Sequence, residues 1–325
     1  MRRAQQSEYQ DTLAAPEQRL LKEAGKPPVR RVVLEEAYPI DRAMKLSGKL
    51  TVVTGAGRGI GRTIALRQAE EGATVALLAR SADAIAVVAD EINRAGGVAR
   101  AYALDVLDRS SVEASFDLIR RDMGPIALLT NNAAAFSAIG PIWDVDPDVW
   151  WRDLEISIRG AFNCCRAVLP AMIAHGDGRI INMVGGGAAS SFPYGSGYGT
   201  GKAGLLRFTE CVSDTLDGTG VRIFALDPGL VRTAMTEYQL ASEAGRTWLP
   251  TVAKLFSDGI DVPPLLAARL TVEIGSGRFD RMAGRMLMAA RGDLDLTPER
   301  IERIVREDLR SLRVNGVPAE RLRDR

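Results

Sequence analysis

The chain has 325 residues, a formal net charge of +1, and a composition of 46% hydrophobic and 26% charged residues. This balance provides no basic surface for nucleic acid or for an anionic membrane. No run of about 18 apolar residues indicates a membrane-spanning helix, and the N-terminus lacks the apolar stretch of a secretory signal. We therefore expect a cytoplasmic protein with neither a nucleic-acid partner nor a membrane partner.

The residues that most often carry metal or nucleophilic chemistry are scarce. Cys164, Cys165 and Cys211 lie in apolar helical contexts and are predicted to be buried and reduced. The single histidine, His175, stands in a sequence typical of a helix end followed by a turn, which favours a surface position. No metal is therefore predicted, and a Ser-His-Asp triad is disfavoured.

The first 45 residues differ in character from the rest of the chain. Residues 1–45 are polar, contain Pro27-Pro28 and show no strong hydrophobic period, so we predict an N-terminal arm or linker. The apolar run Val32-Val33-Leu34 leaves open that this arm packs on a neighbouring subunit.

From residue 49 onward, short apolar segments alternate with amphipathic ones. Strands are expected at 50–54, 75–79, 101–104, 126–130, 179–184 and 221–226, and helices at 59–71, 82–95, 110–123, 147–174 and 197–216. Buried parallel strands are typically continuous apolar runs, whereas helices repeat their apolar residues every three to four positions. The alternation predicts an α/β fold in which residues 46–290 form one Rossmann-type domain with a doubly wound parallel sheet.

Beyond residue 226 the alternation becomes irregular. Residues 230–264 are predicted to form a lid over the substrate, and residues 291–325 a C-terminal helical tail. In that tail Thr297 is the expected N-cap and Pro298 the first helical residue. The tail helix is expected to pack on the core or on a partner subunit through Ile301, Ile304, Val305, Leu309 and Leu312.

A glycine-rich turn, Thr54-Gly55-Ala56-Gly57-Arg58-Gly59-Ile60-Gly61, joins the first expected strand to the first expected helix. Glycines let the backbone bend sharply and approach a pyrophosphate, which is stabilised at the positive end of the helix dipole. Because the turn lies within a βαβ unit, it predicts a bound nicotinamide dinucleotide.

The spacing of this turn resembles the short-chain dehydrogenase/reductase family, and further motifs occur in that family's order over residues 46–290. They are Asp105-Val106 near the adenine, Asn131-Asn132-Ala133-Ala134 with Ala134 in place of the family's glycine, the Tyr198–Lys202 pair, and Pro228-Gly229-Leu230-Val231-Arg232-Thr233 around the nicotinamide carboxamide. The resemblance implies an oxidoreductase acting on CH–OH groups. It also implies cofactor contacts from Gly55, Arg58, Gly59, Ile60, Gly61, Asp105, Val106, Asn132, Ala133, Tyr198, Lys202, Pro228, Gly229, Val231 and Thr233.

The end of the second strand predicts which nicotinamide cofactor is bound. An acidic residue there would hydrogen-bond the ribose diol and repel a 2′-phosphate, but this position is Ala79 and Arg80 follows it. Arg58 adds a second cation, and both guanidinium groups are suited to a 2′-phosphate. We therefore predict NADP(H) rather than NAD(H), with a purely solvated Arg80 as the alternative.

Tyr198 and Lys202 lie four residues apart, on one face of the expected helix, and are the candidate catalytic pair. Tyr198 would act as general acid/base, with its phenolate favoured by the nearby ammonium and by an oxidised nicotinamide. The resemblance implies that Lys202 also holds the nicotinamide ribose. The family's helix asparagine falls on Ser157, which is kept as a third candidate catalytic residue.

The family's catalytic serine, thirteen residues before the tyrosine, falls on Gly185. Removing one donor to a developing oxyanion commonly costs about 3–4 kcal/mol. Ser190, Ser191, Ser196 or the amides of residues 185–187 are alternative donors, or the glycine run makes room for a bulky substrate.

These observations favour an NADP(H)-dependent oxidoreductase that interconverts a ketone and a secondary alcohol. A non-redox lyase, isomerase or cyclase and an NADP(H)-sensing binding protein stay open as alternatives, because Gly185 and Ser157 replace the usual serine and asparagine. A bulky apolar substrate is expected from the aromatic and apolar residues near the lid, which are Trp143, Phe192, Tyr194, Met235, Tyr238, Trp248, Leu249 and Phe256. The resemblance implies a homodimer or homotetramer.

Overall fold

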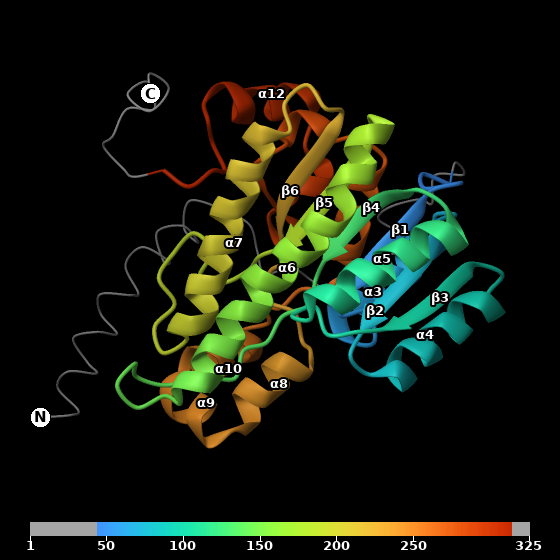
Figure 1. Ribbon diagram of the computed structural model, residues 1–325. Helices are drawn as coiled ribbons and strands as arrows, with labels where there is room; N and C mark the ends of the chain where they lie inside the picture. Colours follow the sequence, from blue (N-terminus) through green and yellow to red (C-terminus); the bar gives the residue numbers. More distant parts are fainter. Residues whose placement is uncertain (1–43, 314–325) are drawn as a thin grey trace, which may run out of the picture.

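The computed structural model describes residues 44–313 (Figure 1). Within these residues, parallel strands form a seven-stranded sheet in the order β3-β2-β1-β4-β5-β6-β7. The strands are β1 (Leu50–Thr54), β2 (Thr74–Ala79), β3 (Val98–Ala103), β4 (Ile126–Asn131), β5 (Gly178–Met183), β6 (Val221–Asp227) and β7 (Met286–Met288). The order reverses between β1 and β4, where a doubly wound sheet leaves a crevice at its carboxyl edge. The predicted Rossmann-type α/β fold is confirmed.

Helices cover both faces of the sheet. They are α3 (Gly59–Glu70), α4 (Ala82–Arg94), α5 (Arg109–Met123), α6 (Pro147–His175), α7 (Ser196–Thr215), α8 (Ala234–Ala241), α9 (Glu243–Trp248), α10 (Pro250–Ser257), α11 (Pro264–Gly275) and α12 (Pro298–Arg306). On one face α6 packs between α5 and α7, and on the other α3 packs against α4 and α11 (Figure 1). The short helices α8, α9 and α10 follow β6 and gather at one end of the molecule (Figure 1).

Successive residues of the central strands point to opposite layers. Val52 and Ile180 belong to the apolar cluster beneath α5 and α6, whereas Val53 and Ile181 belong to the cluster beneath α3, α4 and α11. Because both faces are buried, these strands are apolar throughout and not alternating. Because the strands are parallel, their carboxyl ends lie at one edge of the sheet, where the loops of the site begin.

The structure departs from the sequence expectations at the sheet edges and after β6. The third strand begins at Val98, earlier than expected, because β3 is an edge strand whose side chains are mostly exposed. The strand β7 and the helix α11 were not predicted; β7 has three residues, and α11 is apolar around most of its surface. The proposed lid, residues 230–264, contains α8, α9 and α10.

The C-terminal helix begins as expected and ends early. Thr297 caps α12 and Pro298 is its first residue, with Ile301 and Ile304 buried in the main core. The helix stops at Arg306, so Leu309 is not on its apolar face and is exposed. The predicted arm falls almost wholly on residues 1–43, which lie outside the described residues, and the division into arm, domain and tail stays a prediction.

Two of the three cysteines and the histidine take the positions expected for them. Cys164 and Cys165 are buried in α6, and burial raises the pKa of the Cys165 thiol to about 12. Cys211 is exposed on α7, so its predicted burial is wrong: it faces outward from a helix whose opposite side meets the core. His175 is exposed at the end of α6. In residues 44–313 no group of three or more His, Cys, Asp or Glu side chains is placed to hold a metal, and no helix is long and apolar enough to cross a membrane.

Candidate functional site

The glycine-rich turn has a backbone that only glycine adopts easily. Gly55 has a φ of +66° and Gly59 a φ of +55°, which place both in the left-handed region. A Cβ atom on Gly61 would lie 2.4 Å from the carbonyl oxygen of Gly55 and 2.5 Å from Nδ2 of Asn132. The side chain of Arg58, the N-cap residue, makes no capping hydrogen bond, so the first amides of α3 are left for another acceptor. This geometry suits a phosphate group.

The ends of β1 and β4 are tied together beneath this turn. The hydroxyl oxygen of Thr54 accepts the backbone N–H groups of Asn132 and Ala133, each at 3.0 Å. In return, Nδ2 of Asn132 donates to the carbonyl of Thr54 at 3.0 Å. Asn132 therefore links the carboxyl ends of β1 and β4 at the base of the crevice.

A cleft of about 530 Å³ at the carboxyl edge of the sheet brings most of the predicted residues together. Its predicted lining residues are Gly55, Arg58, Gly59, Ile60, Arg80, Asp105, Val106, Asn132, Ala133, Tyr198, Lys202, Pro228 and Thr233. Within residues 44–313, Gly61, Gly229, Val231 and Ser157 are not part of that lining. They lie behind it: Val231 and Ser157 are buried, and the N–H of Gly229 donates to Asp227 Oδ1 at 2.9 Å.

Positive charge gathers at the end of the cleft that lies beside the end of β2. Arg58, Arg80 and Ser81 line it together, and the Ser81 hydroxyl caps the start of α4. The one carboxylate among the described lining residues, Asp105, is already partnered, because its Oδ2 lies 2.9 Å from Nη2 of Arg152. At the end of β2, where a carboxylate would recognise a ribose diol, the lining residues are Ala79, Arg80 and Ser81.

The candidate pair lies at the opposite end of the cleft, on α7. Lys202 is 2% exposed, its Nζ donates to the carbonyl of Met183 at 2.7 Å, and it lies 5.5 Å from the centre of the Tyr198 ring. Burial lowers the pKa of Lys202 to about 8, an effect that the Asp227 carboxylate opposes.

The charges around the phenol act against its ionisation. Burial raises the pKa of Tyr198, and the carboxylates of Asp227 and Asp153 raise it further. This direction is opposite to the lowering expected from Lys202 and an oxidised nicotinamide. The two carboxylates are therefore part of the electrostatic setting of Tyr198, and neither was identified from the sequence.

Gly185 lies beside the tyrosine hydroxyl, as the family pattern implied. A Cβ atom on Gly185 would lie 3.2 Å from Oη of Tyr198. A Cβ atom on Gly186 would lie 3.0 Å from the Phe192 ring, and one on Gly187 would lie 2.7 Å from Cα of Gly199 and 3.1 Å from Cβ of Phe192. The space beside Gly186 and Gly187 is thus filled by Phe192 and by the backbone of α7.

The serines proposed as substitute donors are placed less favourably. Ser190 and Ser191 are exposed, and Oγ of Ser196 accepts the indole N–H of Trp150 at 2.9 Å. Ser157 is 1% exposed on α6 and donates to the carbonyl of Asp153, in its own helix, at 3.2 Å. Ser157 also faces α7, because a Cβ atom on Gly201 would lie 3.1 Å from its Cβ.

An aromatic cluster surrounds Tyr198. The ring of Phe136 stacks on the Tyr198 ring with centroids 4.7 Å apart and planes 14° apart, and Phe192 meets both rings edge-on. Leu249 and Phe256, from the proposed lid, pack in the same apolar cluster as Phe136. Phe136 was not identified from the sequence, because a single phenylalanine in a loop carries no periodic signal.

The other proposed pocket residues divide into two groups. Met235 lines the cleft, and Trp248 packs against Tyr194 at 4.9 Å between ring centroids. Trp143 is 86% exposed and Tyr238 is 48% exposed, and neither is among the described residues that line the cleft. Both lie on irregular or short elements whose side chains turn toward solvent.

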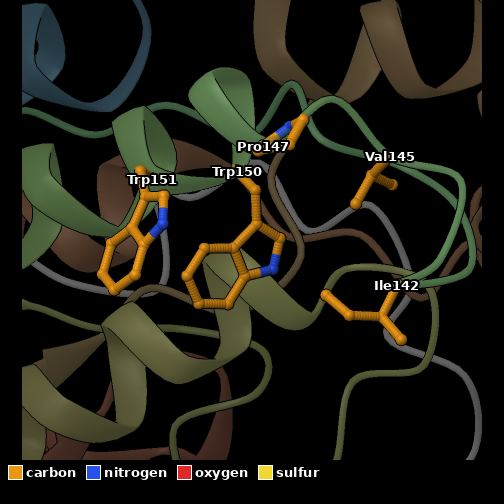
Figure 2. Close-up of a pocket in the computed structure, with 5 residues that line it drawn as sticks. All are labelled: Ile142, Val145, Pro147, Trp150 and Trp151. Atoms are coloured by element: carbon orange, nitrogen blue, oxygen red, sulfur yellow. The ribbon is translucent and has the colours of Figure 1, made fainter.

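A second, smaller hollow of about 240 Å³ lies at the start of α6 (Figure 2). Figure 2 shows its lining, which consists of Ile142, Val145, Pro147, Trp150 and Trp151 and shares no residue with the cleft. None of these side chains is titratable, so the hollow offers packing surface and no acid–base chemistry.

Known proteins resemble this chain in sequence. The family model described as short chain dehydrogenase matches residues 49–244. A short chain dehydrogenase of Monascus purpureus is 34% identical over 262 residues, covering 78% of this chain and 85% of that protein. A short chain dehydrogenase of Pseudocercospora fijiensis is 34% identical over 193 residues. The match covers 59% of this chain and 62% of the length of that relative.

Solved structures share the fold. A putative NAD(P)-dependent gluconate 5-dehydrogenase from Beutenbergia cavernae, with bound NADP, has a TM-score of 0.69 and 28% identity. The match covers 78% of this chain and 100% of that one. An NAD⁺-bound xylitol dehydrogenase also has a TM-score of 0.69 and 28% identity, covering 75% of this chain and 98% of its own.

Proposed function

The chain belongs to the short-chain dehydrogenase family, whose members are NAD(P)-dependent oxidoreductases of CH–OH groups, and we propose that it interconverts a ketone and a secondary alcohol with NADP(H). The observation that carries this proposal is the shared cleft, in which Tyr198 and Lys202 lie on the same surface as the glycine-rich turn. A reacting carbonyl between them would meet both a proton donor and the cofactor.

The chain's own residues fit the dinucleotide. The free amides at the start of α3 would hold the pyrophosphate, and the close packing allowed by Gly55 and Gly61 brings the start of α3 against the ends of β1 and β4. When bound, the nicotinamide supplies or accepts the hydride. Pro228 and Thr233 line the cleft on the side where its carboxamide would be held.

Tyr198 is the proposed general acid/base. Its hydroxyl would give a proton to the alkoxide oxygen during ketone reduction and take it back during alcohol oxidation. Lys202, held by its hydrogen bond to Met183, would offset the two carboxylates that oppose the phenolate. Ser157 remains a candidate for supporting this proton path from the facing helix.

NADP(H) is favoured over NAD(H) by the charge at the adenosine end. Arg58 and Arg80 both line the cleft, and within residues 44–313 neither forms an ion pair with a carboxylate. A 2′-phosphate would gain two cations there and meet no unpartnered acid.

A bulky, apolar substrate is favoured by the walls around Tyr198. Phe136, Leu249 and Phe256 form a buried apolar cluster, against which Tyr198 and the cleft-lining Met235 pack on the lid side of the phenol. A hydroxyl-rich substrate would find few hydrogen-bond partners on that surface, whereas apolar area would be removed from water.

A cytoplasmic homodimer or homotetramer is the proposed assembly. The outer face of α6 exposes Trp151 and Phe162, which are 57% and 46% exposed. Apolar patches of this kind are common where subunits meet. Light scattering of the purified protein would give the mass; a monomer at all concentrations would contradict the proposal.

A non-redox enzyme is the second candidate function, and Gly185 favours it. Without a hydroxyl beside Tyr198, stabilisation of a developing oxyanion is weaker, while proton transfer by the phenol remains available. An NADP(H)-sensing binding protein would need neither oxyanion stabilisation nor proton transfer at Tyr198.

One variant separates these candidates. Tyr198→Phe should lower the kcat for oxidation of NADPH by apolar cyclic ketones about 10²- to 10⁴-fold and leave NADPH affinity within about twofold, because only the proton donor is lost. Tyr238→Phe, at an exposed position, is the matched control. In the wild-type protein, turnover of a substrate without net change in nicotinamide absorbance would support the non-redox candidate. Binding of NADPH by the wild-type protein with no turnover of any substrate would contradict both enzyme functions.

A further inference from the structure

The helix α6 carries a carboxylate in an unusual position. Asp153 is 1% exposed and lies one turn before Ser157, on the side of α6 that faces the core. Its Oδ2 accepts the backbone N–H groups of Ser137 and Ala138 at 2.7 and 2.8 Å. Its Oδ1 is buried and has no hydrogen-bond partner among the described residues. A buried carboxylate is costly to retain for packing alone, which indicates a specific role.

We propose that Asp153 is a positioning residue for Tyr198, acting through the loop between β4 and α6. The two amides that it binds follow Phe136 directly, and the Phe136 ring lies flat on the Tyr198 ring. The chain of contacts therefore runs from the Asp153 carboxylate to the loop backbone, then to Phe136 and to the phenol. The inference rests on Tyr198 being the acid/base of the proposed function.

The absence of a side chain at position 185 gives this chain of contacts its importance. A side chain on Gly185 would touch the Tyr198 hydroxyl, but glycine leaves the phenol without a partner from the end of β5. The phenol ring is held instead by Phe136 on its face and by Phe192 at 6.1 Å between centroids. Ring packing orients the tyrosine only if the loop that carries Phe136 is itself fixed, and the two amide bonds to Asp153 fix it.

The same carboxylate also contributes charge. The ionisable groups acting on Tyr198 come from three elements: Asp153 on α6, Lys202 on α7 and Asp227 at the end of β6. Burial raises the pKa of Asp153, and the two amide bonds oppose that rise. Whenever Asp153 is ionised, its charge raises the pKa of Tyr198. Removing that charge while keeping the acceptor oxygen should therefore lower the pKa of Tyr198.

Two variants separate position from charge. Asp153→Asn keeps an oxygen for the two amides, so kcat should stay within about threefold and the apparent pKa of alcohol oxidation should move to lower pH. Asp153→Leu has similar volume but no acceptor, so kcat should fall about tenfold or more with NADPH affinity unchanged, since a misplaced reacting group loses rate and not cofactor binding. Asp148→Asn and Asp148→Leu, exposed near the start of the same helix, are the matched controls.

A third variant covers the case in which Asp153→Leu does not fold. Phe136→Leu removes the ring stack and leaves the amides bound, and it should give the same loss of kcat at constant NADPH affinity. A wild-type kcat in Asp153→Leu or in Phe136→Leu would overturn the proposal. A large loss of kcat in Asp153→Asn with an unshifted pH profile would overturn it as well. If Tyr198→Phe is fully active, the proposed function fails; if Tyr198→Phe is inactive while the Asp153 variants behave as wild type, only this inference fails.

Discussion

At the glycine-rich turn the cleft is shaped by main-chain atoms, whereas around Tyr198 it is shaped by side chains from separate parts of the chain. In the first region a Cβ added to Gly61 would lie 2.4 Å from the Gly55 carbonyl oxygen, and the Thr54 hydroxyl and the Asn132 amide bind main-chain groups at 3.0 Å. The second depends on rings and carboxylates brought by the β4–α6 loop, by α6, by the β5–α7 loop and by the end of β6. Main-chain geometry tolerates few residue types, and side-chain packing tolerates many.

The largest effect is expected where the main chain leaves no room. In Gly61→Ala the new Cβ would lie 2.4 Å from the carbonyl oxygen of Gly55, so α3 must move away from the turn. Helix propensity alone would stabilise alanine by about 1 kcal/mol. We nevertheless expect a net loss of about 1–3 kcal/mol in the free energy of unfolding, and NADPH affinity reduced about tenfold or more because the pyrophosphate cradle opens.

Denaturant unfolding and fluorescence titration with NADPH measure both quantities. Glu70→Ala, an exposed substitution on the same helix, is the control and should change neither by much. A Gly61→Ala protein as stable as wild type would show that this region is less constrained than its contacts indicate.

This difference between the regions explains what could be predicted from the sequence. The turn, the Asn131–Ala134 motif and the Tyr198–Lys202 pair were identified because each depends on a fixed spacing within one segment. The tie between Asn132 and Thr54 joins separate segments and was not predicted. Phe136, Asp153 and Asp227 were missed because their significance arises only when distant segments meet. Apolar strands buried on both faces gave a clear signal, while the exposed edge strand β3 and the three-residue β7 did not.

A pair of substitutions at Gly185 tests the catalytic region more finely. Gly185 has a φ of +154°, which L side chains rarely adopt, so Gly185→Ala and Gly185→Ser should both lose about 1–3 kcal/mol of stability. Both place a Cβ 3.2 Å from the Tyr198 hydroxyl, and only serine can donate to a reacting oxygen. We expect the serine variant to turn over about tenfold faster than the alanine variant, a fraction of the full value of an oxyanion donor.

The comparison of serine with alanine cancels the strain that both share. Steady-state kinetics with one ketone and thermal melts of both proteins provide the measurement. Equal kcat in the two variants would mean that a hydroxyl at this position cannot reach the reacting oxygen, and that aromatic packing has displaced the site where it would act.

The smallest effect is expected at the adenosine end, where the cleft depends on exposed side chains and not on main-chain fit. Arg80→Asp should weaken NADPH binding severalfold and leave NADH binding unchanged or slightly tighter, because a carboxylate repels the 2′-phosphate and accepts from a ribose diol. Arg94→Asp, at the other end of α4, controls for the change in net charge. Fluorescence titrations with both cofactors at two salt concentrations give the ratio of the dissociation constants for NADPH and NADH. Only the dissociation constant for NADPH should depend strongly on salt. An unchanged ratio would assign Arg80 to the solvated surface and would leave Arg58 as the cation that selects the cofactor.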